Sequence, residues 1–291
     1  MMDFNMFQEV VKDNILNSLP AEYKEASVSV HAVPKVNRTL HALTVMLPDR
    51  NKAPNIYLEE MYEHYQQNED IQTTLAEVAD AVVEATKEMS KVNPVLDADK
   101  IQDNVVLCLV NSTQNEELLK DVPNRSFQDL SVIYRWVVCV DRDGMQSMII
   151  TNDFAAARGF TEEELFQHAV ENTKRICPPR VKSMQEVMAD LAVEDGMPQE
   201  ILESMGVFDE IPPEKNLWVI TNEMGINGAA SMLYEENLHK LAEQIGTDLY
   251  LLPSSIHETI AVSVEMGAPE YLAQMVHDVN MTAVTLDERL S

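Results

Sequence analysis

The segment LSVIYRWVVCVDRDGMQSMIIT, residues 130–151, decides the fold class. A long apolar run at residues 130–140 meets a second apolar run at residues 145–151 across Asp141-Arg142-Asp143-Gly144. Aspartate followed by glycine between two apolar runs is typical of the tight turn of a β-hairpin. Because a hairpin pairs its two strands antiparallel, the segment predicts an antiparallel sheet in the middle of the sequence.

Capping and periodicity signals place helices around this hairpin. Thr161 and Glu164 have the spacing of a capping box, and Ser183 with Glu186 repeats it. Asp3 is a suitable N-cap for a first helix, whose apolar face is formed by Phe4, Phe7, Val11 and Ile15. Strands are predicted at residues 27–33, 39–47, 105–110, 217–221, 229–233, 248–252 and 258–264. We expect an α+β protein with mostly antiparallel sheets and helices packed on one face of each sheet.

The pattern GxxSM occurs twice, at Gly144–Met148 and at Gly228–Met232. Each copy follows an apolar run that begins at a tryptophan, Trp136 or Trp218, and each precedes a predicted helix. The simpler explanation is that two hairpins of similar geometry select similar residues. The alternative is a duplicated strand–turn–strand–helix module. Both explanations predict a strand at residues 229–233.

Two units are predicted along the chain. Residues 93–104 contain a proline and three aspartates but lack apolar periodicity, which is typical of a linker. We therefore expect an N-terminal α+β unit at residues 1–95 and a larger C-terminal α+β unit at residues 96–291. Within the larger unit, residues 193–216 are rich in acids, methionine and proline and predict an irregular acidic connection.

Charge restricts the classes of partner. The 291 residues include 49 Asp and Glu against 21 Lys and Arg, a formal net charge of −28. Between Ser183 and Glu288 the only lysines or arginines are Lys215 and Lys240. Nucleic acids and anionic membranes are bound through clustered Lys and Arg, so we expect no direct nucleic-acid binding and no membrane binding. A protein partner, in particular a basic one, is the expected class.

Cysteine usage and the N-terminus predict a cytoplasmic protein. Cys108, Cys139 and Cys177 are far apart and form no CxxC motif, which favours a reducing compartment. The first residues lack a basic region followed by an apolar core, and no run approaches the ~18 apolar residues of a membrane span. We expect no metal and no cofactor, since HETIA at residues 257–261 lacks the second histidine of a zinc helix.

The segment from Ser254 to Glu258 has the densest group of catalytically capable side chains. Ser255 and His257 would share one face of an extended segment, with Glu258 on the other. A nucleophilic serine needs a base within hydrogen-bond reach, and neighbours this close in sequence rarely achieve that geometry. The favoured interpretation is a polar turn. The alternative is a hydrolase-type enzyme that uses this segment, and Arg125, on a small polar or cationic substrate.

Three further groups are candidate binding residues. The loop at residues 222–228 tolerates positive φ, so Asn222, Asn227 and Gly228 are candidates for cradling an anion with backbone N–H groups. Arg125 is expected to form a local salt bridge, with a carboxylate or phosphate ligand as the alternative. Met197 and Met205, in the acidic connection, are candidates for an adaptable contact surface.

Several segments together resemble an uncharacterised bacterial family, one of the domain-of-unknown-function families of anaerobic bacteria. They are NIYLEEMYEHY (55–65), DVPNRSFQDLSVIYR (121–135), MIITND (148–153), GFTEEEL (159–165), TNEMGINGAASMLY (221–234) and DLYLLPSSIHETI (248–260). The resemblance implies one architecture over nearly the whole chain and a bacterial cytoplasmic setting. It implies no activity, cofactor or catalytic residue. The sequence therefore favours a non-enzymatic acidic protein that acts by binding another protein.

Overall fold

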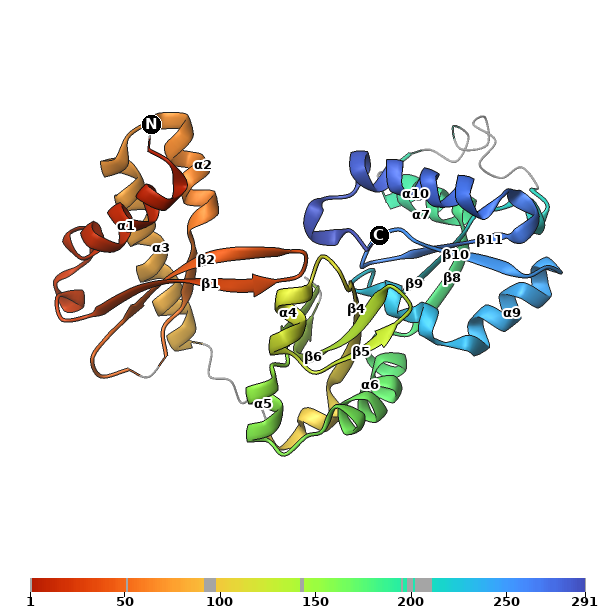
Figure 1. The fold of residues 1–291 in the computed structure, drawn as a ribbon, viewed down its shortest axis with the longest axis horizontal. Coiled ribbons are helices and arrows are strands. Elements are labelled where there is room, and N and C mark those ends of the chain that lie inside the picture. The colour runs from red at the N-terminus through yellow and green to blue at the C-terminus, as the bar shows by residue number, and fades with distance from the viewer. Residues whose placement is uncertain are drawn as a thin grey trace. The chain divides into compact units, whose positions relative to one another are not determined.

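The computed structural model describes residues 2–50, 52–91, 98–141, 144–194, 196–197, 201 and 211–290. The chain divides into two compact units, Met1–Ala98 and Asp99–Ser291 (Figure 1). The expected boundary at residue 95 lies outside the described residues. Every strand pairing among the described residues is antiparallel, which confirms the α+β class.

The first unit is one sheet covered on one face by helices. Its strands, in the order β1 (Ser27–Lys35), β2 (Arg38–Met46) and β3 (Asn55–Tyr57), pack against α1 (Phe4–Ser18), α2 (Leu58–Asn68) and α3 (Ile71–Lys91). A short 3-10 helix, Ala21–Tyr23, joins α1 to β1. Asp3 caps α1 by accepting a hydrogen bond from the Met6 N–H, as predicted.

The second unit begins with a sheet around the predicted hairpin. Its order is β4 (Val105–Asn111), β6 (Leu130–Asp141) and β5 (Asn124–Phe127), and β7 (Gly144–Ile149) also pairs with β6. This pairing confirms the hairpin, although residues 142–143 of its turn lie outside the described residues. Helices α4 (Glu116–Asp121), α5 (Asn152–Ala157) and α6 (Glu162–Ile176) belong to this part, and α6 begins at the predicted Thr161 capping box.

A second sheet completes the unit, in the order β10 (Leu249–Pro253), β11 (Thr259–Ser263), β9 (Trp218–Asn222) and β8 (Pro179–Ser183). Helix α9 (Glu235–Ile245) packs on one face through Leu241, against Ile220 and Ala261. Helix α10 (Pro269–Ala283) packs on the other face through Leu272. Figure 1 shows α7 (Met184–Glu194) on the same side as α10. Helices thus cover both faces of this sheet, whereas we expected helices on one face. Accordingly, β9 is buried at every position.

Residues 229–233 are not a strand. They belong to a 3-10 helix, Gly228–Leu233, which contacts β9 and β4. The segment GAASML has small residues and no apolar alternation, so it fits a close approach to neighbouring backbone better than a place in a sheet. The second GxxSM copy is therefore helical, whereas the first lies in β7, and the two do not form equivalent strand–turn–strand modules.

Short 3-10 helices account for several remaining connections: Ala98–Asp103, Pro213–Lys215, Val264–Met266 and Leu286–Glu288. The first of them lies in the predicted linker, yet Ile101 is fully buried there. No helix among the described residues has the length and apolar character needed to cross a membrane.

Candidate functional site

Two segments that the sequence offered separately meet in the second unit: the loop at residues 222–228 and the segment at residues 254–258. The Asn227 N–H donates to His257 Nδ1 at 3.2 Å, and the Thr221 hydroxyl donates to the His257 carbonyl at 2.8 Å. The Asn227 side chain also accepts from the Cys108 thiol at 3.4 Å. Burial raises the pKa of Cys108 to about 11, so the thiol stays protonated and can donate.

The contacts of His257 do not make it a base for Ser255. Because Nδ1 accepts from Asn227, the ring hydrogen is on Nε2, which lies 3.5 Å from Glu288 Oε1. The Ser255 hydroxyl oxygen accepts from the His257 backbone N–H at 3.0 Å, and Ser255 N–H donates to the Glu258 carbonyl at 3.1 Å. These contacts form a turn, and they leave His257 without a nitrogen that could take a proton from Ser255.

The polar groups of the loop at residues 222–228 form hydrogen bonds within the protein. Asn222 is buried; its amide donates to the Ile226 carbonyl at 2.8 Å and accepts from the Met224 N–H at 3.0 Å. The backbone N–H groups of Met224 and Asn227 are therefore already bonded within the protein. Gly228 is buried, and a Cβ there would lie 2.2 Å from Thr221 Oγ1. These contacts give the loop a packing role.

Arg125 forms the local salt bridge that the sequence favoured. Its guanidinium donates to both carboxylate oxygens of Glu162, at 3.1 and 3.0 Å, and lies 2.5 Å from a Glu163 oxygen. It also stacks over the Phe166 ring at 3.9 Å. Glu162 accepts a further hydrogen bond from the buried Tyr134 hydroxyl. The hydrogen bonds that Arg125 donates, first of all those to Glu162, raise the pKa of Arg125 above its usual range. Burial raises the pKa of Tyr134.

We expect Arg125→Ala to lower the free energy of unfolding of the second unit by about 1 to 2 kcal/mol. The reason is the loss of a bidentate, partly buried pair, which leaves the Glu162 carboxylate without its cation. Urea unfolding followed by tryptophan fluorescence measures it, since both tryptophans are in this unit. The matched control is Lys120→Ala, which removes an exposed pair with Glu117 and should leave the unfolding midpoint close to that of wild type.

The same variant has an expected pH dependence. The hydrogen bond from Arg125 lowers the pKa of Glu163, so this part of the stabilisation is present above the ordinary glutamate pKa of about 4.3. It is lost as the pH falls through the lowered value in the folded state. The stability difference between wild type and Arg125→Ala should therefore shrink on acidification. A difference that stays constant with pH would contradict the assigned contact.

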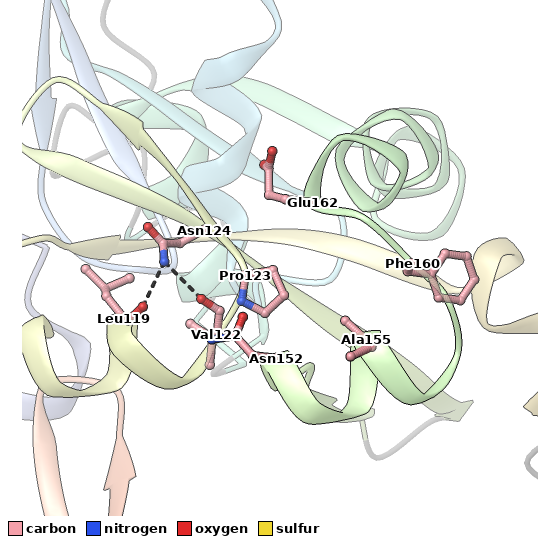
Figure 2. A pocket seen from close by; sticks show the side chains of 9 residues that line it. Leu119, Val122, Pro123, Asn124, Asn152, Ala155, Phe160 and Glu162 are labelled. Carbon is pink, nitrogen blue, oxygen red and sulfur yellow. Dashed lines mark hydrogen bonds between the residues drawn. The ribbon is translucent and has the colours of Figure 1, made fainter.

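An open pocket of about 380 Å³ lies beside this cluster. Figure 2 shows the side chains that line it: Leu119, Val122, Pro123, Asn124, Asn152, Ala155, Ala156, Phe160 and Glu162. The sequence drew attention to Arg125 and missed Glu162, Tyr134 and the pocket itself. The usable signal was the run of three glutamates after Thr161, since a first helical turn with that charge attracts a cation.

An exposed apolar stripe runs along α10. Tyr271, Met275 and Val279, spaced four residues apart, are 68%, 37% and 47% exposed. The neighbouring stripe of the same helix, Leu272 and Val276, packs on the sheet. We call the exposed set the α10 stripe. Exposed apolar side chains also occur on α7 at Met188 and Leu191. The sequence indicated a contact role for Met197 and Met205; Met197 is 36% exposed, and Met205 lies outside the described residues.

No group of three or more His, Cys, Asp or Glu side chains among the described residues is arranged to hold a metal ion. Residues 4–291 match a family model described as a family of unknown function, DUF5688, so the chain belongs to that family. This match confirms the resemblance seen in the sequence. No curated protein and no solved structure gives a significant match.

Proposed function

We propose that this protein binds another protein, and that the α10 stripe receives a basic amphipathic segment of the partner. The observation that carries the proposal is the exposure of Tyr271, Met275 and Val279 on a helix that has no lysine or arginine. Apolar side chains in a row on a helix are more often buried than exposed, and exposed groups of them mark interaction sites. Tyrosine and methionine are enriched at such interfaces.

Charge supports a basic partner. Residues 184–288 include 20 aspartates and glutamates and two lysines. A negative field of this kind speeds the approach of a positively charged partner and weakens as salt screens it. The apolar stripe would supply the affinity, and the surrounding acidic residues would select a basic partner. Amphipathic helices bind apolar surfaces through their apolar face in the same way. The same field supports our expectation that nucleic acids and anionic membranes are not partners.

The proposal includes a bacterial cytoplasmic setting. Its support is the family resemblance together with the free thiols of Cys108, Cys139 and Cys177, since unpaired cysteines are typical of reducing compartments. The competing enzymatic function has weaker support. The His257 ring accepts from the Asn227 N–H, the Ser255 hydroxyl accepts from the His257 backbone N–H, and Arg125 is neutralised by Glu162.

A peptide-binding experiment tests the proposal. The probe is a fluorescent helical peptide with a Lys face and a Leu face, titrated with the full chain at low salt. We expect binding that weakens at about 0.5 M sodium chloride because the Debye length falls to a few ångströms. The variant Tyr271→Ser, Met275→Ser, Val279→Ser should weaken binding about tenfold or more, the equivalent of one lost buried aromatic contact.

The matched control carries three serines on other exposed positions of α10: Ala273→Ser, Gln274→Ser and His277→Ser. It costs at least as much helix propensity, because alanine and glutamine are better helix formers than serine, and it should bind within about twofold of wild type. An acidic peptide with the same Leu face should not bind. Equal binding by the stripe variant and its control, or equal binding of the acidic peptide, would overturn the proposal.

A further inference from the structure

The polar side chains that line the pocket beside Glu162 offer mainly hydrogen-bond acceptors to a ligand. Three polar side chains line it, Asn124, Asn152 and Glu162. The Asn124 amide nitrogen donates to two carbonyls, those of Leu119 and Val122, each at 2.9 Å, as the dashed lines in Figure 2 mark. The Asn152 amide nitrogen donates to the Lys120 carbonyl at 2.9 Å. The side-chain donors are thus largely used by the protein, while within the described residues nothing donates to either amide oxygen.

Glu162 also keeps an acceptor position. Its Oε1 accepts from Arg125 Nε and from Tyr134, which fills that oxygen, whereas Oε2 accepts only from Arg125 Nη2. A carboxylate oxygen accepts two hydrogen bonds, so Oε2 has room for one more. Acceptors without donors are complementary to a ligand that brings N–H groups.

The charge around the pocket is negative. The first turn of α6 holds three carboxylates, Glu162, Glu163 and Glu164, and Arg125 pairs with the first two of them. A helix N-terminus adds about half a positive charge, which reduces this imbalance without cancelling it. An anion is therefore disfavoured at this end of α6, and a cation is favoured.

The rest of the lining is apolar. Leu119, Val122, Pro123, Ala155 and Phe160 offer carbon surface to the pocket. A volume of about 380 Å³ is at the small end of ligand pockets, which run from roughly 300 to 1,000 Å³. A short alkyl chain with a terminal ammonium group is complementary to these three features: the acceptors, the negative charge and the small apolar wall.

We propose that this pocket binds a primary alkylammonium group. The ammonium would be received by Glu162 Oε2 and an asparagine oxygen, and the alkyl chain by the apolar wall. Two sources carry this chemistry, a free aliphatic amine and the side chain of a lysine on another protein. The inference is independent of the α10 stripe, because it concerns a different site and a different ligand.

Two alanines of α5 allow a controlled test. Ala156 lines the pocket and Ala157 does not, and both are exposed on the same short helix. Ala156→Leu fills the pocket without touching the core, and Ala157→Leu adds the same atoms outside it. Glu162→Gln would be a poorer test, because it also disturbs Arg125 and Tyr134.

The experiment titrates the full chain with n-butylammonium and follows backbone amide signals by NMR. We expect shifts at residues 119–124, 152–156 and 160–162, a Kd in about the millimolar range, and about a tenfold loss of affinity in Ala156→Leu. Ala157→Leu should bind within about twofold of wild type. Butanol and butyrate should shift these signals far less.

Three outcomes would overturn the proposal. They are no shifts with butylammonium, equal binding of butanol, which would indicate only an apolar hollow, and stronger binding of butyrate, which would indicate an anion site. A second arm uses Nα-acetyl-lysine-N-methylamide to separate the sources. Binding as strong as that of butylammonium supports a lysine side chain as the ligand, and weaker binding supports a free amine.

Discussion

Gly228→Ala is expected to lower the free energy of unfolding of the second unit by about 3 kcal/mol. A Cβ at this position would lie 2.2 Å from Thr221 Oγ1, 2.4 Å from the His257 carbonyl oxygen and 2.9 Å from the Asn222 nitrogen. Two of these atoms belong to backbone, which cannot rotate away as a flexible side chain would. The loop must separate from the segment around His257, and the Asn227–His257 and Thr221–His257 hydrogen bonds are strained with it.

Tryptophan fluorescence during heating measures this effect, because Trp136 and Trp218 both report on the second unit. A loss of about 3 kcal/mol corresponds to a Tm lower by roughly 6 to 12 °C in a unit of this size. Gly267→Ala is the control, since its backbone is extended and the nearest atom to a Cβ there is 3.8 Å away. That variant should stay within about 1 kcal/mol of wild type. Equal losses in both variants would contradict the packing role of Gly228.

Leu290→Ala is expected to cost about 3 kcal/mol, for a different reason. Leu290 is fully buried although it lies in the last segment of the chain. Its carbonyl accepts from the Asn111 amide at 3.2 Å, and its neighbour Arg289 forms a bridge with Ser255. Truncation of a buried leucine leaves a cavity, and the cost includes both the lost transfer free energy and that cavity.

Leu286→Ala tests whether burial is the cause. Leu286 belongs to the same segment and is 52% exposed, so the same chemical change should cost less than about 0.5 kcal/mol. Urea unfolding of both variants gives the two values. The midpoint should move for Leu290→Ala with little change in the slope, because the unit still unfolds from a compact native state. A midpoint unchanged in Leu290→Ala would show that the segment does not pack as described.

Local rules in the sequence predicted the elements whose contacts are local. The capping interactions of Asp3, Thr161 and Ser183 all span three residues, and each is present. The hairpin of β6 and β7 was likewise predictable, since its turn and its two apolar runs are consecutive. In these cases the residues that determine the structure are close together in the sequence.

The sequence did not predict contacts that depend on distant partners. Residues 229–233 were expected to be a strand, but Gly228 is held against His257, 29 residues further along, and this contact favours a 3-10 helix. The short strands β5 and β8 went unpredicted because their partners define them. The candidate residues were chosen without their partners for the same reason: Arg125 meets Glu162 across 37 positions, and His257 meets Asn227 across 30.

The Asn111–Leu290 contact also bears on the order in which the chain can fold during synthesis. The first unit has all of its core within the first 98 residues, so it can complete its contacts early. Strand β4, which follows soon after, finds one of its partners 179 positions later. Loop closure over such a distance is slow. The sheet that contains β4 therefore lacks this contact until Leu290 has emerged from the ribosome, and we expect it to depend on protection from aggregation until then.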